Sequence, residues 1–386
     1  MLDFIRIACA VPPVKVGDVK KNAEDICAYM EKADAANADL VVFPELALTG
    51  YSCGDLFFQD MLWNAVKTGL KQICECSKKY PALNAVVGLP IRLNSKLLNC
   101  AALIRNGGMR GIVPKTYLTE AEKRWFVSGA DLKETAAGLD VFGNDEFGFV
   151  SLRTDLLIEI GDGAVVGIEI CEDMNAPVPT SALLAVNGAN VIVNPSASPE
   201  VAGKRLQRTN RVKANSVAGT CIYAYVSAGM TESTADQVYC GQSIIAENGT
   251  VLKENGKLID SDYMIVQDCD LGRIRAERQK NSSFRQAACF YGDRQYLNES
   301  MLGNAELRAD GTLYPVQKLP FIPSTKAERD AYCKEVFQLQ AAGLAQRLKT
   351  IHANAVIGIS GGLDSTLALL VCVEAMRMLG RPATDI

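Results

Sequence analysis

Three residues that could carry out covalent chemistry each follow an apolar, β-branched run of the chain. Glu45 is the next-to-last residue of the run VVFPEL, Lys115 ends RGIVPK, and Cys171 follows VVGIEI just before an expected turn into a helix. Groups at strand ends gather at one edge of an α/β sheet, which is where ligands bind. We therefore expect these three side chains to lie together, although they are far apart in the sequence.

Cys171 raises the question of how a thiol is activated without a nearby histidine. The residues that follow it, Glu172 and Asp173, are acidic and disfavour a thiolate, and the one histidine, His352, is distant in the sequence. A carboxylate beside a lysine ammonium can accept the thiol proton, and the ammonium can then stabilise an oxyanion. Backbone N–H groups at the turn, first of all that of Glu172, would also favour the thiolate.

Each residue alone has an ordinary explanation. A single buried cysteine usually fills a core, and a single Lys or Glu at a strand end is usually solvated. A carboxylate, an ammonium and a thiol in the same context after three β-rich runs favour catalysis instead. The strings FPELALTGY, GIVPKTYL and GIEICEDM resemble the motifs of the nitrilase superfamily, the carbon–nitrogen hydrolases.

That resemblance covers about residues 4–270 and implies an α-β-β-α sandwich. It further implies that Glu45 is the general base, that Lys115 stabilises the tetrahedral intermediate, and that Cys171 attacks an amide or nitrile carbon.

A second motif, VIGISGGLDSTLALLV, spans 356–371 between an expected strand and an expected helix. It lacks the Gly-Lys-Ser/Thr end of a Walker A loop and the spacing of a dinucleotide fingerprint. A glycine turn with an Asp cap is the ordinary alternative, yet the full SGGLDS string resembles the pyrophosphatase loop of enzymes that adenylate substrates with ATP. A loop of this kind presents N–H groups and a helix N-terminus to an anion. The resemblance implies an ATP site made of Ser360, Gly361, Gly362, Leu363, Asp364 and Ser365.

A nitrilase-like amidase followed by this loop resembles the glutamine-dependent NAD⁺ synthetase family. The resemblance implies a ligase whose first domain hydrolyses L-glutamine through a thioester, without a cofactor. The ammonia then reaches deamido-NAD⁺ that a second domain has adenylated with ATP and Mg²⁺. It also implies a homo-oligomer. The alternatives are a nitrilase-type amidase fused to a different adenylating domain and a degenerate scaffold module.

The same resemblance implies contacts to glutamine from Tyr51, Glu172, Ser198 and Lys204. Lys204 stands where the family often has an arginine, which would grip a carboxylate as a rigid fork.

The family often has a tyrosine shortly after its lysine, and this chain has Ala121 there, so Trp125 or Phe126 is expected to fill the space. Glu120 or Glu122 could place an additional carboxylate near Lys115, and the sequence does not choose between them.

Composition narrows the class of protein. The chain has 386 residues, 48% hydrophobic and 22% charged, with a net charge of −4, which is typical of a globular protein with two or three domains. Without clustered Lys and Arg, or an apolar run near the roughly 18 residues of a membrane span, we expect neither nucleic acid nor membrane as a partner. The first residues lack a signal-peptide core, and thirteen cysteines favour reduced thiols in the cytoplasm. One histidine and no Cys-x-x-C pair argue against a metal site.

The apolar patterns predict strands alternating with helices, interrupted by hairpins at 97–115 and 242–256. This mixture favours an α/β or α+β layered sandwich over a plain doubly wound sheet. The strands are expected at 4–11, 39–46, 84–91, 163–170, 189–198 and 221–229, and the helices at 18–38, 60–79, 179–188 and 204–220.

The pattern divides the chain into three parts. Residues 1–275 form the nitrilase-like glutaminase domain, 276–325 a polar, irregular linker, and 326–386 the truncated start of a Rossmann-like adenine nucleotide hydrolase α/β domain. This last part has a helix at 326–349, a strand at 354–360 and a helix from 364. One strand and one helix cannot bury both faces of a parallel sheet. We therefore expect this chain to be part of a longer one and, alone, to have at most glutaminase activity.

Overall fold

The computed structural model describes residues 3–132, 136–139, 150–161, 163–257, 260–292, 296–300, 312–316, 318–323 and 325–386. The chain forms two compact units, residues 1–314 and residues 315–386. Each unit is described by itself.

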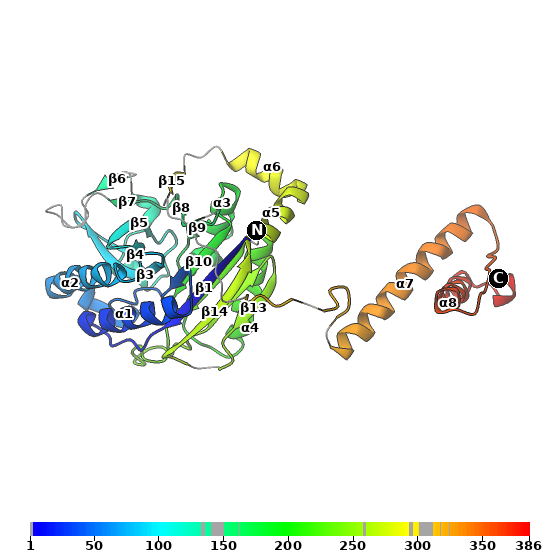
Figure 1. Cartoon of the computed structure of the whole chain (residues 1–386), viewed down its shortest axis with the longest axis horizontal. Coiled ribbons are helices and arrows are strands. Elements are labelled where there is room, and N and C mark those ends of the chain that lie inside the picture. The colour runs from blue at the N-terminus through cyan, green and yellow to red at the C-terminus, as the bar shows by residue number, and fades with distance from the viewer. Residues whose placement is uncertain are drawn as a thin grey trace. The chain divides into compact units, whose positions relative to one another are not determined.

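The first unit contains two mixed sheets (Figure 1). The eight-stranded sheet has the order β14-β1-β2-β3-β4-β5-β7-β6, and the seven-stranded sheet has the order β13-β12-β11-β10-β9-β8-β15. The strands of the eight-stranded sheet are β1 (Phe4–Val11), β2 (Leu40–Val42), β3 (Asn84–Leu93), β4 (Lys96–Arg105), β5 (Gly108–Pro114), β6 (Ala136–Leu139), β7 (Val150–Leu152) and β14 (Tyr263–Asp270). The strands of the seven-stranded sheet are β8 (Leu156–Glu159), β9 (Val165–Ile168), β10 (Val191–Ser196), β11 (Ile222–Ser227), β12 (Ser243–Glu247), β13 (Thr250–Glu254) and β15 (Leu297–Ser300).

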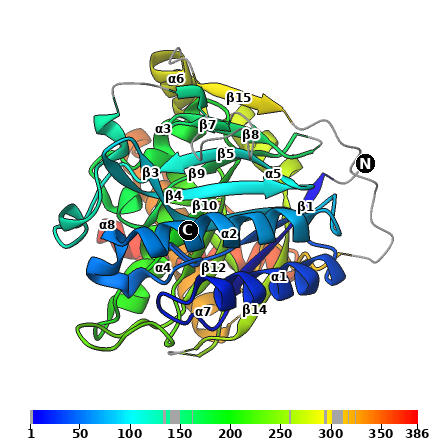
Figure 2. The ribbon, with the colours of Figure 1, turned by 90° about the vertical axis from the view of Figure 1, so that its left-hand side faces the viewer.

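Helices cover the outer faces of both sheets. On the eight-stranded sheet, α1 (Val19–Ala35) and α2 (Asp60–Ser77) lie side by side (Figures 1 and 2). On the other sheet, α3 (Thr180–Val186) and α4 (Lys204–Ala218) pack against the strands. Alternate strand residues face either these helices or the opposite sheet, as the two-residue period of a strand requires. The α-β-β-α sandwich predicted from the sequence is confirmed.

Most predicted elements are found within a few residues of their expected bounds, and both hairpins are present. The sequence 39–46 was expected to be strand throughout, but β2 ends at Val42, because Pro44 cannot donate to a ladder and Leu46 has φ +51°. The side chain of Asp18 caps α1 by accepting the N–H of Lys21.

The prediction of an irregular segment from 276 onward is wrong for its first part. Two helices, α5 (Leu271–Lys280) and α6 (Ser282–Tyr291), occupy it. Their N-caps are Asp270 and Asn281, each of which accepts a backbone N–H three residues later. None of the residues of α6 is fully buried, and only Phe284, Ala287 and Ala288, at i, i+3 and i+4, are half-buried. This short apolar face and the capping residue Asn281 were the available signals.

In the second unit, the expected helices are confirmed as α7 (Lys326–Ile351) and α8 (Leu363–Leu379). The strand predicted at 354–360 is wrong, because this segment pairs with no strand in the described part of the chain. An apolar run becomes a strand only where a neighbour accepts and donates its backbone hydrogen bonds. Within the described ranges, no helix has the length and apolar character needed to cross a membrane.

Candidate active site

The three residues singled out by the sequence come from two facing sheets rather than from one sheet edge. Glu45 lies in the turn after β2 and Lys115 directly after β5, both in the eight-stranded sheet. Cys171 begins the short 3-10 helix η4 (Cys171–Asn175), which follows β9 of the other sheet. The backbone N–H of Glu45 donates to the carbonyl of Ser196 in β10, at 3.3 Å, so the two sheets are joined next to the site.

Lys115 is held between two carboxylates in the interior. Its Nζ lies 2.6 Å from Oε1 of Glu45 and 2.7 Å from Oε1 of Glu122, and all three side chains are at most 1% exposed. Asn99 Nδ2 donates to the same two oxygens, at 2.7 and 3.2 Å. This settles the choice left open by the sequence in favour of Glu122, since Glu120 pairs with Lys123 at the surface. Asn99 was not predicted from the sequence to belong to the site. The available signal was a single amide side chain inside the apolar run LLNCAAL.

Glu45 has one oxygen engaged and one available. Oε1 receives Lys115 and Asn99, whereas Oε2 is buried and has no hydrogen-bond partner among the described residues. Burial raises the pKa of Glu45 to about 7, although the Lys115 ammonium acts in the opposite direction. A carboxylate with a pKa near neutrality and a free buried oxygen is suited to accept a proton.

The burial of Cys171 corrects one expectation from the sequence. Burial, together with the Glu45 carboxylate, raises the pKa of the thiol to about 12, which outweighs the effect of Lys115 and of a backbone hydrogen bond from Ala197. The resting group is therefore a thiol, and it must lose its proton as it attacks. Cys171 also has φ +47°, a conformation that costs a non-glycine residue free energy and that recurs at functional sites.

A buried aspartate connects the lysine segment to the cysteine segment. Asp173 Oδ1 accepts the N–H groups of Thr116, at 3.1 Å, and of Tyr117, at 2.7 Å. Its Oδ2 accepts the N–H of Ile170, at 2.9 Å. Asp173 thus fixes the residues on either side of the Lys115–Cys171 gap. From the sequence, Asp173 was predicted only to disfavour the thiolate.

We predict that Asp173→Asn lowers the turnover rate for an amide substrate by about 100-fold, because an amide cannot accept hydrogen bonds at both ends and the two segments shift. Steady-state kinetics with a thermal melt check this. Asp262→Asn is a control, since that carboxylate accepts from Tyr29 away from the catalytic cluster. A normal turnover rate in folded Asp173→Asn would contradict the prediction.

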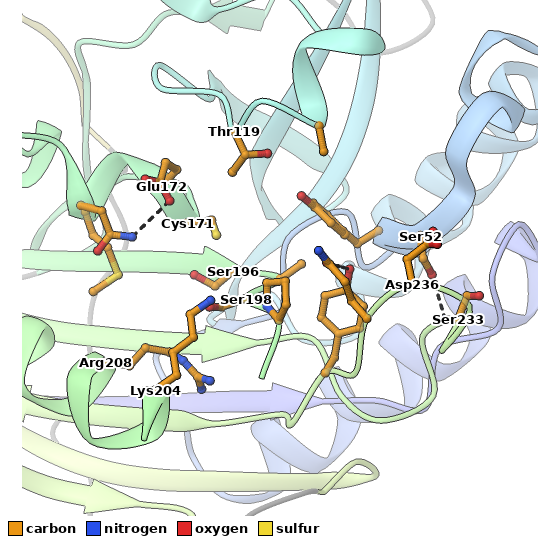
Figure 3. Close-up of a pocket in the computed structure, with 18 of the residues that line it drawn as sticks. Ser52, Thr119, Cys171, Glu172, Ser196, Ser198, Lys204, Arg208, Ser233 and Asp236 are labelled. Carbon is orange, nitrogen blue, oxygen red and sulfur yellow. Dashed lines mark hydrogen bonds between the residues drawn. The ribbon is translucent and has the colours of Figure 1, made fainter. Parts of the chain in front are cut away.

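A pocket of about 1010 Å³ opens above Cys171. All four residues predicted to contact glutamine line it, as does Trp125, whereas Phe126 is buried in the core against Phe57. Cys171 and Glu172 lie on one side, and Ser196, Ser198, Lys204 and Arg208 on another (Figure 3).

The cations of the pocket differ in their availability. Arg208 is committed to Glu200 and Gln242 through charge-assisted hydrogen bonds. Lys204, the half-buried first residue of α4, forms no ion pair with any residue that the structure describes, and it lines the same pocket. Lys204 is therefore the better placed of these two cations to bind a carboxylate. Its position at the N-terminus of α4 adds the favourable end of the helix dipole.

The glycine loop of the second unit has the features of an anion-binding turn. Gly361 has φ +82°, a conformation that glycine adopts without strain. The hydroxyl of Ser360 accepts the N–H of Gly362 at 3.4 Å and lies 3.2 Å from that of Ser365. The loop and the start of α8 are exposed, so the N-terminus of this 17-residue helix can receive a phosphate. The residues present fit a nucleotide phosphate.

Residues 6–279 match the family model described as carbon-nitrogen hydrolase. The chain belongs to the carbon–nitrogen hydrolase family. Among curated relatives, it is 36% identical to a protein of Mycobacterium bovis named glutamine-dependent NAD(+) synthetase, over 99% of this chain and 57% of the relative. A Mycobacterium leprae protein of the same name is 34% identical over 99% of this chain and 56% of its own length. The chain thus spans rather more than half the length of these relatives.

A solved structure supports the carbon–nitrogen hydrolase fold. The glutamine-dependent NAD(+) synthetase of Cytophaga hutchinsonii has a TM-score of 0.58 and 23% identity, covering 97% of this chain and 52% of that one.

Proposed function

We propose that this carbon–nitrogen hydrolase is the glutamine-hydrolysing part of a glutamine-dependent NAD⁺ synthetase. The observation that carries the proposal is the buried Glu45–Lys115–Glu122 cluster beside Cys171, which itself lines a pocket that holds both cations and carboxylates. The names of the mycobacterial relatives support the choice of glutamine over other amides.

The chemistry follows from the positions of the buried groups. As Cys171 Sγ attacks the carboxamide carbon of glutamine, Glu45 Oε2 accepts the thiol proton, and the Lys115 ammonium stabilises the negative oxygen. The C–N bond then breaks, Glu45 returns the proton to the leaving nitrogen, and a thioester and ammonia form. Water attacks the thioester with Glu45 again as base, which releases glutamate and restores the thiol.

The pocket charges can orient the amino acid end of glutamine. Lys204 pairs with the α-carboxylate, assisted by Ser198, and Glu172 on the opposite side attracts the α-ammonium. Tyr51 forms a third wall.

The whole protein would be an ATP-consuming ligase. In this proposal residues 1–275 form the glutaminase domain, 276–325 a connection, and 326–386 the first part of a Rossmann-like synthetase domain. The residues Ser360–Ser365 would bind ATP, which with Mg²⁺ would adenylate the carboxylate of deamido-NAD⁺ and release pyrophosphate. Ammonia would then displace AMP and form the amide. Free ammonia is mostly protonated at pH 7, so it is passed internally. We place the enzyme in the cytoplasm, as a homo-oligomer.

The test is release of glutamate from L-glutamine, compared with asparagine, acetamide and propionamide, together with trapping of the thioester by hydroxylamine. Glutamine-selective release with formation of the glutamyl hydroxamate is expected. Equal or faster hydrolysis of the simple amides would indicate a general amidase instead. NAD⁺ synthesis is expected only from the longer protein, and its formation by residues 1–386 alone would refute our division of the chain.

A further inference from the structure

Glu232 lies in the loop between β11 and β12, in a position that the catalytic chemistry does not use. Its side chain is buried, with 4% of the residue exposed. One oxygen accepts the backbone N–H of Tyr51 at 2.8 Å. The other accepts the N–H of Ser52 at 3.1 Å and the Ser52 hydroxyl at 2.5 Å.

The carboxylate is compensated by these N–H and O–H groups alone. No lysine or arginine of the described residues forms an ion pair with Glu232, although a buried charge normally requires a partner. Two successive backbone N–H groups converging on one anion form a strong and directional site. Gly50, directly before them, has φ +86°, so this backbone turn is shaped to wrap around the carboxylate.

Further hydrogen bonds join the loop that carries Glu232 to neighbouring segments. The Ser52 hydroxyl accepts the N–H of Ser233 at 2.9 Å, and Thr231 Oγ1 accepts the N–H of Val14 at 2.8 Å. The 231–233 loop is thereby fastened to the chain around residues 14 and 51. Ser52 and Ser233 lie at the end of the pocket away from Lys204 (Figure 3).

The residue that this arrangement orients is Tyr51. Its ring lines the pocket and packs edge-on against Tyr239, with ring centres 5.9 Å apart. Tyr51 lines the same pocket as Cys171, and burial, with the Glu45 carboxylate, raises the pKa of the Tyr51 hydroxyl. Tyr239 belongs to the same connection between β11 and β12 as Glu232, so both rings of this wall depend on one loop.

We propose that Glu232 is a positioning residue that holds Tyr51 and Ser52 in place by binding their backbone N–H groups, and so forms the pocket wall needed to bind substrate. In its application to glutamine this inference rests on the function proposed above. Glu232 makes no hydrogen bond to Glu45, Lys115 or Cys171, so its loss weakens substrate binding more than it slows the chemical step.

The decisive variant is Glu232→Gln, because it keeps the size of the side chain but turns an NH₂ group toward an N–H donor. The matched control is Glu247→Gln. Glu247 is likewise a buried carboxylate outside the pocket lining, and it accepts the N–H of Asp270 at 2.7 Å and the hydroxyl of Tyr314 at 2.8 Å. Unlike Glu232, it also pairs with a cation, Arg273, at 3.0 Å.

Three measurements on these variants test the proposal. For Glu232→Gln we expect KM for glutamine to rise about 10-fold or more, equivalent to about 1.4 kcal/mol of binding, while kcat stays within about threefold. Amide hydrogen exchange at Tyr51 and Ser52 should become faster, and the alkylation rate of Cys171 by iodoacetamide should stay near that of wild type. For Glu247→Gln we expect unchanged KM and unchanged exchange at residues 51 and 52.

Other outcomes of these measurements would overturn the proposal. Unchanged KM and exchange in Glu232→Gln, or equal losses in both variants, would show that Glu232 has no special role at the pocket. If Glu232→Gln does not fold, Glu232→Asp, whose shorter side chain cannot reach both N–H groups, is measured in the same way. If wild type releases no glutamate, the proposed function fails, and the exchange rates at Tyr51 and Ser52 alone decide the role of Glu232.

Discussion

Replacement of Cys171 by alanine is expected to lower glutamate release by about 10,000-fold or more, to the background of water attack. The Cys171 sulfur is the atom that forms the thioester. Among the described residues, Cys171 is the cysteine that lines the pocket. Glu45 and Lys115 remain in the variant, but they have no nucleophile to activate. Coupled detection of glutamate, with mass spectrometry for the acyl-enzyme, measures the effect.

The fold of Cys171→Ala should be retained. The hydrogen bonds of Lys115 to Glu45 and Glu122 do not involve the sulfur, and alanine retains the φ +47° strain rather than adding to it. Its melting temperature should therefore stay within about 3 °C of wild type, since no buried ion pair or large core side chain is lost. Cys289→Ala, at an exposed position on α6, is the control and should keep full activity. Substantial turnover by Cys171→Ala would exclude a thioester.

The candidate catalytic groups could be predicted from the sequence because strand ends are recognisable in a single chain. Each of the three follows an apolar run, and a run such as 4–11 is found as β1 with the same bounds. The layers followed from mixing hairpins with βα units. Which strands share a sheet depends on contacts between distant segments, so the sequence put Glu45 and Cys171 at one edge when two sheets supply them.

Close approaches between distant segments of the chain could not be predicted from the sequence either. A Cβ on Gly88 in β3 would lie 2.4 Å from the N of Leu46 and 2.5 Å from the carbonyl of Pro44, so glycine is needed for the Glu45 turn to lie against this strand. The sequence shows that Gly88 lies in a predicted strand, but it does not show which segment packs against that glycine. Asp173 and Glu232 were overlooked for a similar reason, because they bind backbone N–H groups in other segments and match no motif.

Glu45→Gln is the second change expected to have a large effect, lowering kcat/KM for glutamine by about 1,000-fold. The amide keeps the size of the side chain and one oxygen for Lys115, but it cannot accept the thiol proton. With the thiol pKa raised to about 12 by burial, almost no thiolate exists at pH 7 without that base. Lys115 would remain beside the Glu122 carboxylate, so the site should keep its shape.

The pH dependence of kcat/KM provides a second test of Glu45 as the base. Glu45 acts as base only when it is ionised, and burial raises its pKa to about 7, so wild-type kcat/KM should rise with pH and level off above that value. In Glu45→Gln that step should disappear, leaving a low rate that increases with pH until the thiol itself ionises near 12. Rates measured from pH 5.5 to 9 test both curves.

Alkylation of Cys171 tests the role of Glu45 as base in the absence of a substrate. In wild type, the rate with iodoacetamide should follow the same ionisation near pH 7, because Glu45 removes the thiol proton whichever electrophile is present. In Glu45→Gln it should fall and lose this step. Asp155→Asn, which removes a surface partner of Arg153, is the control and should match wild type. If alkylation kept its step near pH 7 in Glu45→Gln, a group other than Glu45 would be the base.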